Sequence, residues 1–332
     1  MKRFNRTFAL SVCLLILALF LPAVNSTRVD AATVSAGECV IEISSRRFLH
    51  ERNADQRLPM ASTTKILTAL VILEDCNLDE VVTVPKQAEG TEGSSVYLKA
   101  GEQISVRDLL YGLMLRSGND CAVTLALFHS GSIQNFARAM NDKALSIGAE
   151  HSHFVNPHGL PNEQHYTTAR DLALIAAAAM QNDTFCEIVS TKFYAPRGWQ
   201  NKNKMLWNFE GALGVKTGFT VRAGRCLVSA AQREGMTVVS VVLNSPQMFE
   251  RSEELLENAF ENYRMVQLCS AAEQYEGCRV LYDFSYPLKS DEKDKIRIEY
   301  ERENVQGEIA GAMKIYLENR LLFSQNLFII NE

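Results

Sequence analysis

The strongest constraint on the fold is that strand-like segments lie at both ends of a long, helix-rich stretch. Residues 38–43 and 48–53 have the composition of strands and are joined by a short polar turn, which predicts a hairpin. Branched residues gather again in 214–216, 226–231 and 237–243, with polar turn-like stretches between them. This order predicts one α/β layer structure whose sheet is completed by distant parts of the chain.

The middle of the chain is predicted to be helical. Residues 62–75 are apolar at nearly every position after Lys65, which indicates a helix buried on most sides. Ser105 and Thr168 each begin a Ser/Thr-x-x-acid spacing just before an apolar run, the pattern that caps a helix start. A further helix over 249–263 closes this unit.

Beyond about residue 266 the pattern changes to alternation, as in 296–300 and 313–323, with Glu318 and Asn319 as a turn. This predicts a small β domain over 266–332, which we expect to act as a spacer or partner platform. The last residues are apolar and strand-like, so no amphipathic helix is expected at this end of the sequence.

The first residues have the order of an export signal. Cations among the first six residues precede an apolar run over 8–24, followed by a polar stretch and small residues near Ala31. We expect cleavage near Ala31, so that 1–31 is a signal peptide. The run is at the short end for crossing a bilayer, and a retained N-terminal anchor stays an alternative. Either way we expect the protein to work outside the cytoplasm.

Charge and cysteine content exclude several classes of protein. The formal net charge is -5, without the basic stripe that a nucleic-acid binder needs, so no nucleic-acid partner is expected. Of the 8 cysteines, Cys13 lies in the signal, and the others are scattered without a Cys-x-x-Cys pair. An odd number in this pattern predicts no disulfide framework and no metal or redox site. Most are expected to be small buried side chains.

Short polar motifs carry the chemistry. In chain order they are Ser62-Thr63-Thr64-Lys65, Ser117-Gly118-Asn119 and Lys216-Thr217-Gly218. A Ser-x-x-Lys occurs by chance roughly once in such a chain, and a second copy, Ser290 to Lys293, lies in a charged, surface-like run. The first copy differs because it opens a buried helix, where free amides favour developing negative charge. Each of the other triplets is expected by chance only about a tenth of a time.

These residue types suit nucleophilic catalysis. A serine hydroxyl needs a base within hydrogen-bond reach, and Lys65 lies one helical turn from Ser62. Lysine is a base only when its pKa falls, which burial and a second ammonium such as Lys216 would both cause. Ser117 is expected to relay a proton to a leaving amine, while Asn119 binds a substrate amide and orients Lys65.

The third motif is predicted to lie on a strand edge. There Lys216 and Thr217 can hold a carboxylate, and Gly218 lets another backbone approach closely.

The motifs and their neighbours resemble the serine penicillin-recognising enzymes, and within them the low-molecular-mass D-alanyl-D-alanine carboxypeptidases. The matching segments are Pro59-Met60-Ala61-Ser62, Ser117-Gly118-Asn119-Asp120, Asn156-Pro157-His158-Gly159-Leu160 and Gly214-Val215-Lys216-Thr217-Gly218. The resemblance covers about 35–265 well and the β tail loosely. It implies an α/β fold of the β-lactamase and DD-peptidase type, an antiparallel sheet flanked by helices with a helical subdomain. The catalytic domain would span 32–265, followed by the small C-terminal β domain.

The resemblance also implies a reaction and its residues. Ser62 would attack the carbonyl between the terminal D-alanines of a peptidoglycan stem pentapeptide, with Lys65 as base and no cofactor or metal. The amides of Ser62 and Phe219 would form the oxyanion hole, and Lys216 with Thr217 would hold the terminal carboxylate. β-Lactams would acylate Ser62 and leave slowly. Arg251 falls where the family has an arginine near the carboxylate pocket.

The sequence departs from the family pattern at Phe219, where a histidine is often found, and at the strand-like end, where the family has an amphipathic membrane anchor. We interpret Asn156 to Leu160 as a structural loop beside the site. The sequence leaves open the oligomeric state, association with the membrane surface, and the choice between carboxypeptidase and endopeptidase cleavage.

Other functions remain as alternatives. A zinc peptidase would use histidines, but no metal-binding spacing links them; they are His151, His153, His158 and His165. A class A β-lactamase would need a deacylating glutamate, for which Glu163 is the candidate without the expected neighbours. A β-lactam sensor or wall-binding module would keep the motifs and lose turnover.

Overall fold

The computed structural model describes residues 35–302 and 309–330. The expected signal over 1–31 lies outside these residues. Within them, no single helix has the length and hydropathy to cross a bilayer, and a bent pair, α6 (Ala169–Ala179) with α7 (Asp183–Ser190), passes by length and composition only.

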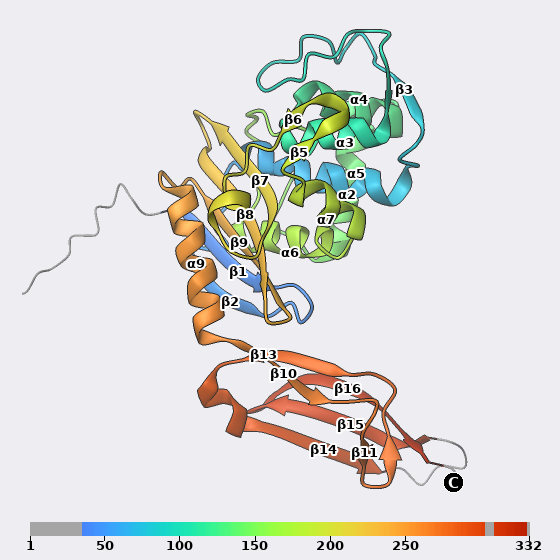
Figure 1. Ribbon diagram of the computed structural model, residues 1–332, viewed down its shortest axis with the longest axis vertical. Coiled ribbons are helices and arrows are strands. Elements are labelled where there is room, and N and C mark those ends of the chain that lie inside the picture. The colour runs from blue at the N-terminus through green and yellow to red at the C-terminus, as the bar shows by residue number, and fades with distance from the viewer. Residues whose placement is uncertain (1–34, 303–308, 331–332) are drawn as a thin grey trace, which may run out of the picture. The chain divides into compact units, whose positions relative to one another are not determined.

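An antiparallel sheet in the order β2-β1-β9-β8-β7 forms the centre of the motif-bearing part of the chain (Figure 1). Its strands are β1 (Gly37–Glu42), β2 (Phe48–Arg52), β7 (Ala212–Thr220), β8 (Gly224–Arg233) and β9 (Met236–Leu243). β1 pairs with β9, so the N-terminal hairpin joins strands that come much later in the chain. This confirms the predicted hairpin and the completion of the sheet by distant segments.

Helices pack on both faces of this sheet, as Figure 1 shows. α9 (Met248–Asn262) covers one face, where Leu256 and Phe260 are buried with Val242 of β9. α6 lies against β1 and β9 on the other face, with Ile175 in the same core cluster as Val239. The helical group continues from α6, so the α/β class with a helical subdomain is confirmed.

The helical group is built around α2, which is buried from Lys65 to Ile72. Besides α6 and α7, the helices of this part of the chain are α2 (Lys65–Asp75), α3 (Val106–Leu115), α4 (Asn119–Ser130), α5 (Ile133–Ile147) and α8 (Met205–Asn208). It also contains the 3-10 turns η2 (Ala61–Thr64) and η3 (Ala195–Arg197). Two short strand pairs complete it, β3 (Val81–Thr83) with β4 (Gln103–Ser105) and β5 (Phe193–Tyr194) with β6 (Trp199–Gln200). Both predicted caps are present, because the side chains of Ser105 and Thr168 accept from the amides of Asp108 and Asp171 at 3.0 Å.

The chain after α9 is β-rich, as predicted. It contains β10 (Arg264–Cys269) paired with β13 (Phe284–Leu288), the sheet β11 (Gln274–Tyr275), β12 (Cys278–Arg279), β16 (Arg320–Ile329), β15 (Ile309–Leu317) and β14 (Ile296–Arg302), and the turn η4 (Ser290–Lys295). Met313 and Ile315 are buried in its core, and Phe284 stacks on Phe323 with ring centroids 4.3 Å apart. Glu318 forms the predicted turn between β15 and β16.

The cysteine thiols of the described residues are free, and most are buried, as the sequence predicts.

Candidate active site

The first motif lies where the turn η2 runs into α2. The sequence predicts a helix from Ser62, whereas the structure places Ser62 in the 3-10 turn and begins α2 at Lys65. Ala61 has a φ of 50°, a left-handed conformation that costs energy for a residue with a Cβ and is common at functional sites. The tight turn directs Ser62 toward an opening, while Lys65 points into the interior and is fully buried.

The amine of Lys65 is held by oxygens on all sides. Its Nζ lies 3.0 Å from Ser62 Oγ, 2.7 Å from Asn119 Oδ1 and 2.6 Å from the His158 carbonyl. The loop that carries His158 therefore lies beside the site, as expected, and contributes a backbone oxygen. Asn119 and His158 fix the direction in which the amine faces Ser62.

The two buried lysines of the site are destabilised in their charged forms. Burial lowers the pKa of Lys65 well below its usual range, and the charge of Lys216 lowers it further. Burial, together with the charge of Lys202, also lowers the pKa of Lys216 to about 7. The site therefore contains two buried lysines, and the charge of Lys216 contributes to the lowered pKa of Lys65.

The second motif lies between α3 and α4. Ser117 is buried with a φ of 65°, and Asn119 is the first residue of α4. The Asn119 side chain donates to the Glu92 carbonyl at 2.6 Å, and its backbone amide donates to the Ser94 carbonyl at 2.7 Å. Because its amide group donates to Glu92, the Asn119 carbonyl oxygen is left facing Lys65.

A buried carboxylate ties this motif to the preceding loop. Asp120 is completely buried and accepts from Ser95 Oγ at 2.6 Å, from the Val96 amide at 3.1 Å and from the Leu98 amide at 3.0 Å. Backbone amides thus solvate the carboxylate in place of water. This arrangement holds the loop that carries Ser94 against the site.

The third motif lies on β7, an edge strand of the sheet. The Lys216 side chain is only 2% exposed and its Nζ donates to the Thr217 carbonyl at 2.9 Å. A Cβ placed on Gly218 would lie 3.1 Å from both the Ser62 amide nitrogen and the Met60 carbonyl oxygen. Only glycine allows this contact without displacement, so the expected close approach of another backbone is present, and that backbone is the Ser62 turn.

The three motifs meet at one cavity of about 300 Å³. Its lining residues are Ser62, Ser94, Ser117, Lys202, Lys204, Thr217, Gly218, Phe219, Met248 and Phe249. Phe219 is 64% exposed at the rim. Segments from η2, the α3–α4 connection and β7, all far apart in the sequence, therefore form one site.

Arg251 is not among the residues that line this cavity, and its expected place near the carboxylate pocket stays a prediction. Its guanidinium binds the fully buried carboxylate of Glu38 through Nε at 2.9 Å and Nη2 at 2.8 Å. A buried carboxylate needs cationic partners, and Arg52 supplies another at 2.9 Å. The ion pair between Arg251 and Glu38 therefore links α9 to β1.

The histidines and Glu163 do not form a second chemical centre. Burial lowers the pKa of His158 to about 3 and that of His165 to about 4. His165 Nε2 lies 2.8 Å from Thr64 Oγ1 and contributes to packing under η2. Within residues 35–302 and 309–330, no group of His, Cys, Asp and Glu is arranged to hold a metal ion. Glu163 is exposed and does not line the Ser62 cavity.

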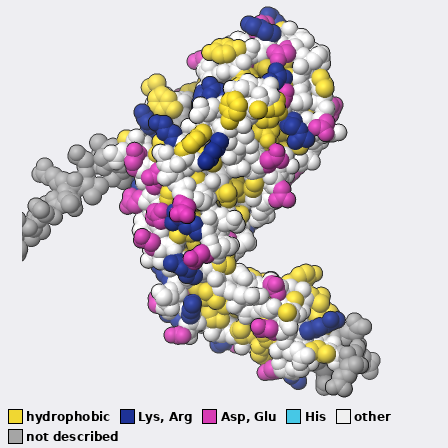
Figure 2. All heavy atoms as spheres, in the orientation of Figure 1, with side chains coloured by type: hydrophobic (Ala, Val, Ile, Leu, Met, Phe, Trp, Pro, Cys, Tyr) yellow, Lys and Arg dark blue, Asp and Glu magenta, His cyan; other side chains and the backbone are white. Residues whose placement is uncertain are grey.

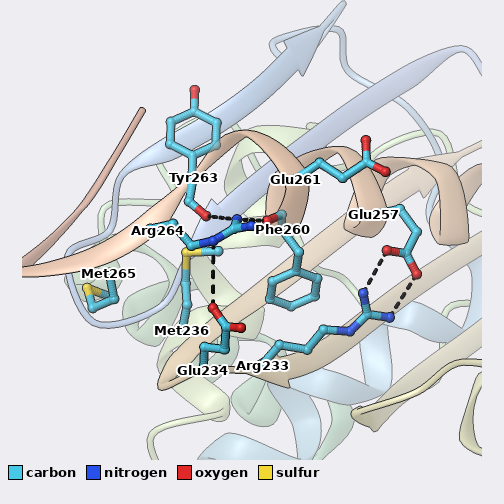
Figure 3. A pocket seen from close by; sticks show the side chains of 9 residues that line it. All are labelled: Arg233, Glu234, Met236, Glu257, Phe260, Glu261, Tyr263, Arg264 and Met265. Carbon is cyan, nitrogen blue, oxygen red and sulfur yellow. Dashed lines mark hydrogen bonds and ion pairs between the residues drawn. The ribbon is translucent and has the colours of Figure 1, made fainter. Parts of the chain in front are cut away.

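Another hollow, of about 220 Å³, lies at the C-terminal end of α9 and is lined by charged residues (Figure 3). Arg233 binds Glu257 through two nitrogens at 2.6 and 2.8 Å, and Arg264 lies 3.6 Å from Glu234. Side chains of both signs lie next to one another over α9 (Figure 2). The charged side chains of this hollow form ion pairs with one another, so we interpret these residues as structural.

Comparisons with known proteins agree with the fold. Residues 25–247 match the family model of D-alanyl-D-alanine carboxypeptidases of the peptidase S11 type. The D-alanyl-D-alanine carboxypeptidase of Streptomyces sp. (strain K15) is 38% identical over 250 residues, which cover 68% of this chain and 86% of the relative. D-alanyl-D-alanine carboxypeptidase DacF of Bacillus subtilis is 31% identical over 284 residues, 79% of this chain and 72% of the relative.

The solved structure of penicillin binding protein 5 from Haemophilus influenzae superposes with a TM-score of 0.75 at 27% identity, covering 90% of this chain and 97% of that one. The fold and its matches define a serine hydrolase of the penicillin-binding class. This chain belongs to the D-alanyl-D-alanine carboxypeptidase family.

Sequence reasoning missed several contributors to the site. Lys202 and Ser94 line the cavity, and the carbonyls of Glu92 and His158 orient Asn119 and Lys65. Backbone oxygens carry no residue signature, and Lys202 lies in a run of alternating Asn and Lys that is typical of a surface loop.

Proposed function

We propose that this chain removes the terminal D-alanine from peptidoglycan stem pentapeptides through an acyl-enzyme on Ser62. The observation that carries the proposal is the 3.0 Å contact between Lys65 Nζ and Ser62 Oγ, combined with the burial and the nearby Lys216 charge that lower the Lys65 pKa. A lowered pKa favours the neutral form of the Lys65 amine, and a neutral amine can accept a proton from the serine.

The contacts of Lys65 suggest how the proton moves. A neutral amine has two hydrogens and one lone pair, and its hydrogens can be donated to Asn119 Oδ1 and the His158 carbonyl. The lone pair then faces Ser62 Oγ and accepts its proton during attack on the carbonyl between the D-alanines. The oxyanion would be bound by the amides of Ser62 and Phe219, each contributing about 3 kcal/mol in comparable sites.

The remaining motif residues would bind and release the leaving amino acid. Lys216 and Thr217 hold its carboxylate, and Gly218 keeps β7 close to the Ser62 turn. Asn119 receives a substrate amide, and Ser117, buried in the cavity wall, passes a proton to the leaving amine. Because β7 is an edge strand, an extended peptide can pair alongside it.

Hydrolysis of the acyl-enzyme completes the cycle. A β-lactam resembles the terminal dipeptide and would acylate Ser62 in the same way, but its ring-opened product would leave slowly. The exposed position of Glu163 supports slow release over a class A β-lactamase activity, since it is not poised to activate a water at Ser62. A non-catalytic sensor on the same fold is the remaining alternative.

The proposed substrate, peptidoglycan, lies outside the cytoplasm, and the location of the protein follows from this. We propose that residues 1–31 direct export, that 32–265 form the catalytic domain and 266–332 the small β domain, and that the protein works at the outer face of the cell membrane or in the wall. The cations and apolar run of the N-terminus support this location.

The decisive experiment combines labelled penicillin with D-alanine release from a pentapeptide. We expect one adduct, mapped by mass spectrometry to the peptide containing Ser62, and release of D-alanine that a chelator does not inhibit. An adduct on another residue would overturn the site assignment. An adduct at Ser62 without D-alanine release would favour a sensor, and rapid turnover of penicillin would favour a β-lactamase.

A further inference from the structure

A buried imidazole lies between the turn that carries Ser62 and the loop whose backbone carbonyl binds Lys65. His165 is 3% exposed, and its ring packs edge-on against Phe154 with centroids 5.7 Å apart. It belongs to none of the three motifs and is not among the residues that line the Ser62 cavity. Any part that His165 plays in the reaction is therefore exerted through other residues.

The hydrogen bonds of His165 define which ring nitrogen has the proton. The Val155 amide donates to His165 Nδ1 at 3.1 Å, so this nitrogen is unprotonated. Nε2 then has the proton, and it lies 2.8 Å from Thr64 Oγ1. The Thr64 hydroxyl donates its single hydrogen to the Ala61 carbonyl at 2.9 Å, so it accepts from His165. The ring therefore accepts on one side and donates on the other.

The donating side of the ring holds the turn of the nucleophile. Ala61 directly precedes Ser62 and has the left-handed φ of 50°. This conformation is unfavourable for alanine, so it persists only where surrounding contacts hold it. The Ala61 carbonyl accepts from Thr64, and a Cβ placed on Gly159 would overlap the carbonyl oxygen. By fixing the Thr64 hydroxyl, His165 fixes the peptide group that precedes Ser62.

The accepting side of the ring holds the loop that faces the proposed base. Val155 begins the segment 155–159, and in this segment the His158 carbonyl accepts from Lys65 Nζ at 2.6 Å. The bond from the Val155 amide ties the start of this segment to His165. One imidazole therefore contacts both the turn of the nucleophile and the loop that directs the amine of Lys65.

This pattern of hydrogen bonds requires a neutral ring. Burial, together with the charges of His153 and Lys65, lowers the pKa of His165 to about 4. At neutral pH one ring nitrogen is therefore free to accept while the other donates. A second proton, on Nδ1, would point at the Val155 amide hydrogen and push the loop away.

We propose that His165 is a positioning residue for acylation of Ser62. Its two hydrogen bonds hold the Ser62 turn and segment 155–159 at one spacing, and this spacing keeps Ser62 Oγ 3.0 Å from Lys65 Nζ. The inference rests on the proposed function, in which Lys65 takes the proton of Ser62. Small displacements of reacting groups slow reactions by large factors, so loss of either bond should lower the acylation rate.

The test removes the two bonds one at a time. The amide of asparagine reaches the position of Nδ1, so His165→Asn can keep the bond to Val155 but loses the bond to Thr64. The longer glutamine reaches the position of Nε2, so His165→Gln can keep the bond to Thr64 but loses the bond to Val155. Stopped-flow acylation by a chromogenic β-lactam gives the rate constant of acylation and the dissociation constant of the first complex separately. We expect each variant to acylate about tenfold more slowly at an unchanged dissociation constant.

Thr64 supplies matched variants at the other end of one bond. Thr64→Val keeps the shape of the side chain without its hydroxyl and should slow acylation, whereas Thr64→Ser keeps the hydroxyl and should restore most of the rate. In the double variant of His165→Asn with Thr64→Val, the loss should be no larger than in Thr64→Val alone, because both changes remove the same bond. The control His151→Gln, at an exposed histidine before α6, should acylate like the wild type.

The results are read on folded protein only, because each rate is normalised to the fraction of Ser62 that finally acylates. If His165→Asn does not fold, the Thr64 pair still decides. Wild-type rates in both His165 variants and in Thr64→Val would overturn the proposal. Equal losses in Thr64→Val and Thr64→Ser, or additive losses in the double variant, would also overturn it, since they indicate a general effect on packing.

The same measurements distinguish this inference from the proposed function. Absence of D-alanine release from the wild type would overturn the proposed function. The role of His165 is measured on the β-lactam adduct, so slower acylation in the His165 variants would still support it. Absence of any adduct on Ser62 in the wild type would overturn both.

Discussion

The Ser62 cavity and the hollow at the end of α9 are both lined by charged side chains, and they differ in how those charges are compensated. In the α9 hollow, Arg233 binds Glu257 at 2.6 Å. Beside the Ser62 cavity, Lys65 and Lys216 are buried, and neither forms an ion pair with a carboxylate in the described part of the chain. Buried unpaired amines reduce stability, so their retention points to chemistry, whereas paired surface charges point to structure.

The sharpest test of this comparison is Ser62→Ala. Removal of the nucleophile should lower kcat for D-alanine release by a factor on the order of 10⁴ or more and abolish the penicillin adduct. The measurements are product release by chromatography and intact-protein mass.

The second Ser-x-x-Lys copy provides the matched control. Ser290 is exposed in η4, and Ser290→Ala should leave both readouts unchanged. Comparable loss in both variants would mean that Ser62 has no special role.

The next largest effect is expected for Lys65→Met. The apolar chain fills similar volume but removes the base, so kcat/KM for acylation should fall by about 10³ to 10⁴. Stopped-flow acylation by a chromogenic β-lactam measures this step directly. Lys293→Met, in the exposed copy of the motif, should have no effect, and a rate for Lys65→Met within tenfold of wild type would refute the role of base.

Lys216→Met should separate function from stability. Loss of the cation should raise KM for the peptide tenfold or more, because an ion-paired carboxylate contact disappears. It should also raise the Lys65 pKa, because the neighbouring positive charge that lowers it is gone. The acidic limb of the pH profile for acylation should therefore move to higher pH.

The stability of Lys216→Met follows from the same pKa. In the folded wild type the Lys216 pKa is about 7, below the usual value of 10.5, so the unfolded state binds more protons between these values. Burial of charged Lys216 therefore lowers the free energy of unfolding of the wild type by its full amount below pH 7. This loss of stability becomes smaller as the pH rises toward 10.5. We expect the variant to be more stable at pH 7, by on the order of 2 kcal/mol, with a difference that narrows toward pH 10. The free energies of unfolding are measured with urea across this pH range. If Lys216 instead formed a stable ion pair, Lys216→Met would be less stable than the wild type at pH 7.

The smallest effect is expected in the α9 hollow. Arg233 stacks 4.6 Å from the Phe209 ring centroid as well as binding Glu257, and Arg233→Met should lower the free energy of unfolding by about 1 kcal/mol. Arg233→Lys should lose part of this, because it lacks the planar fork. D-Alanine release should be unaffected in both variants. A change in kcat would contradict the purely structural role given to the α9 hollow.

Much of the fold could be predicted from the sequence, because many of its helices, strands and caps depend on residues close together in the chain. Strand-like composition with a polar turn predicts the β1–β2 hairpin, and alternation predicts the β15–β16 turn. The apolar run after Lys65 predicts a buried helix. The caps at Ser105 and Thr168 follow from side-chain chemistry within one helical turn. The 3-10 turn at Ser62 was missed, since it depends on the left-handed backbone of Ala61 and on the strand packed against it.

For the site, the sequence by itself determined which nucleophile, amines and amides the chain carries, because those identities are written in three short motifs. Only the tertiary structure decided their surroundings. The carbonyls of Glu92 and His158 that aim the polar side chains have no sequence signature, and the choice of Glu38 as the partner of Arg251 depends on which carboxylate the fold buries beside α9. Contacts made by the backbone, and ion pairs chosen by burial, exist only after the chain has folded.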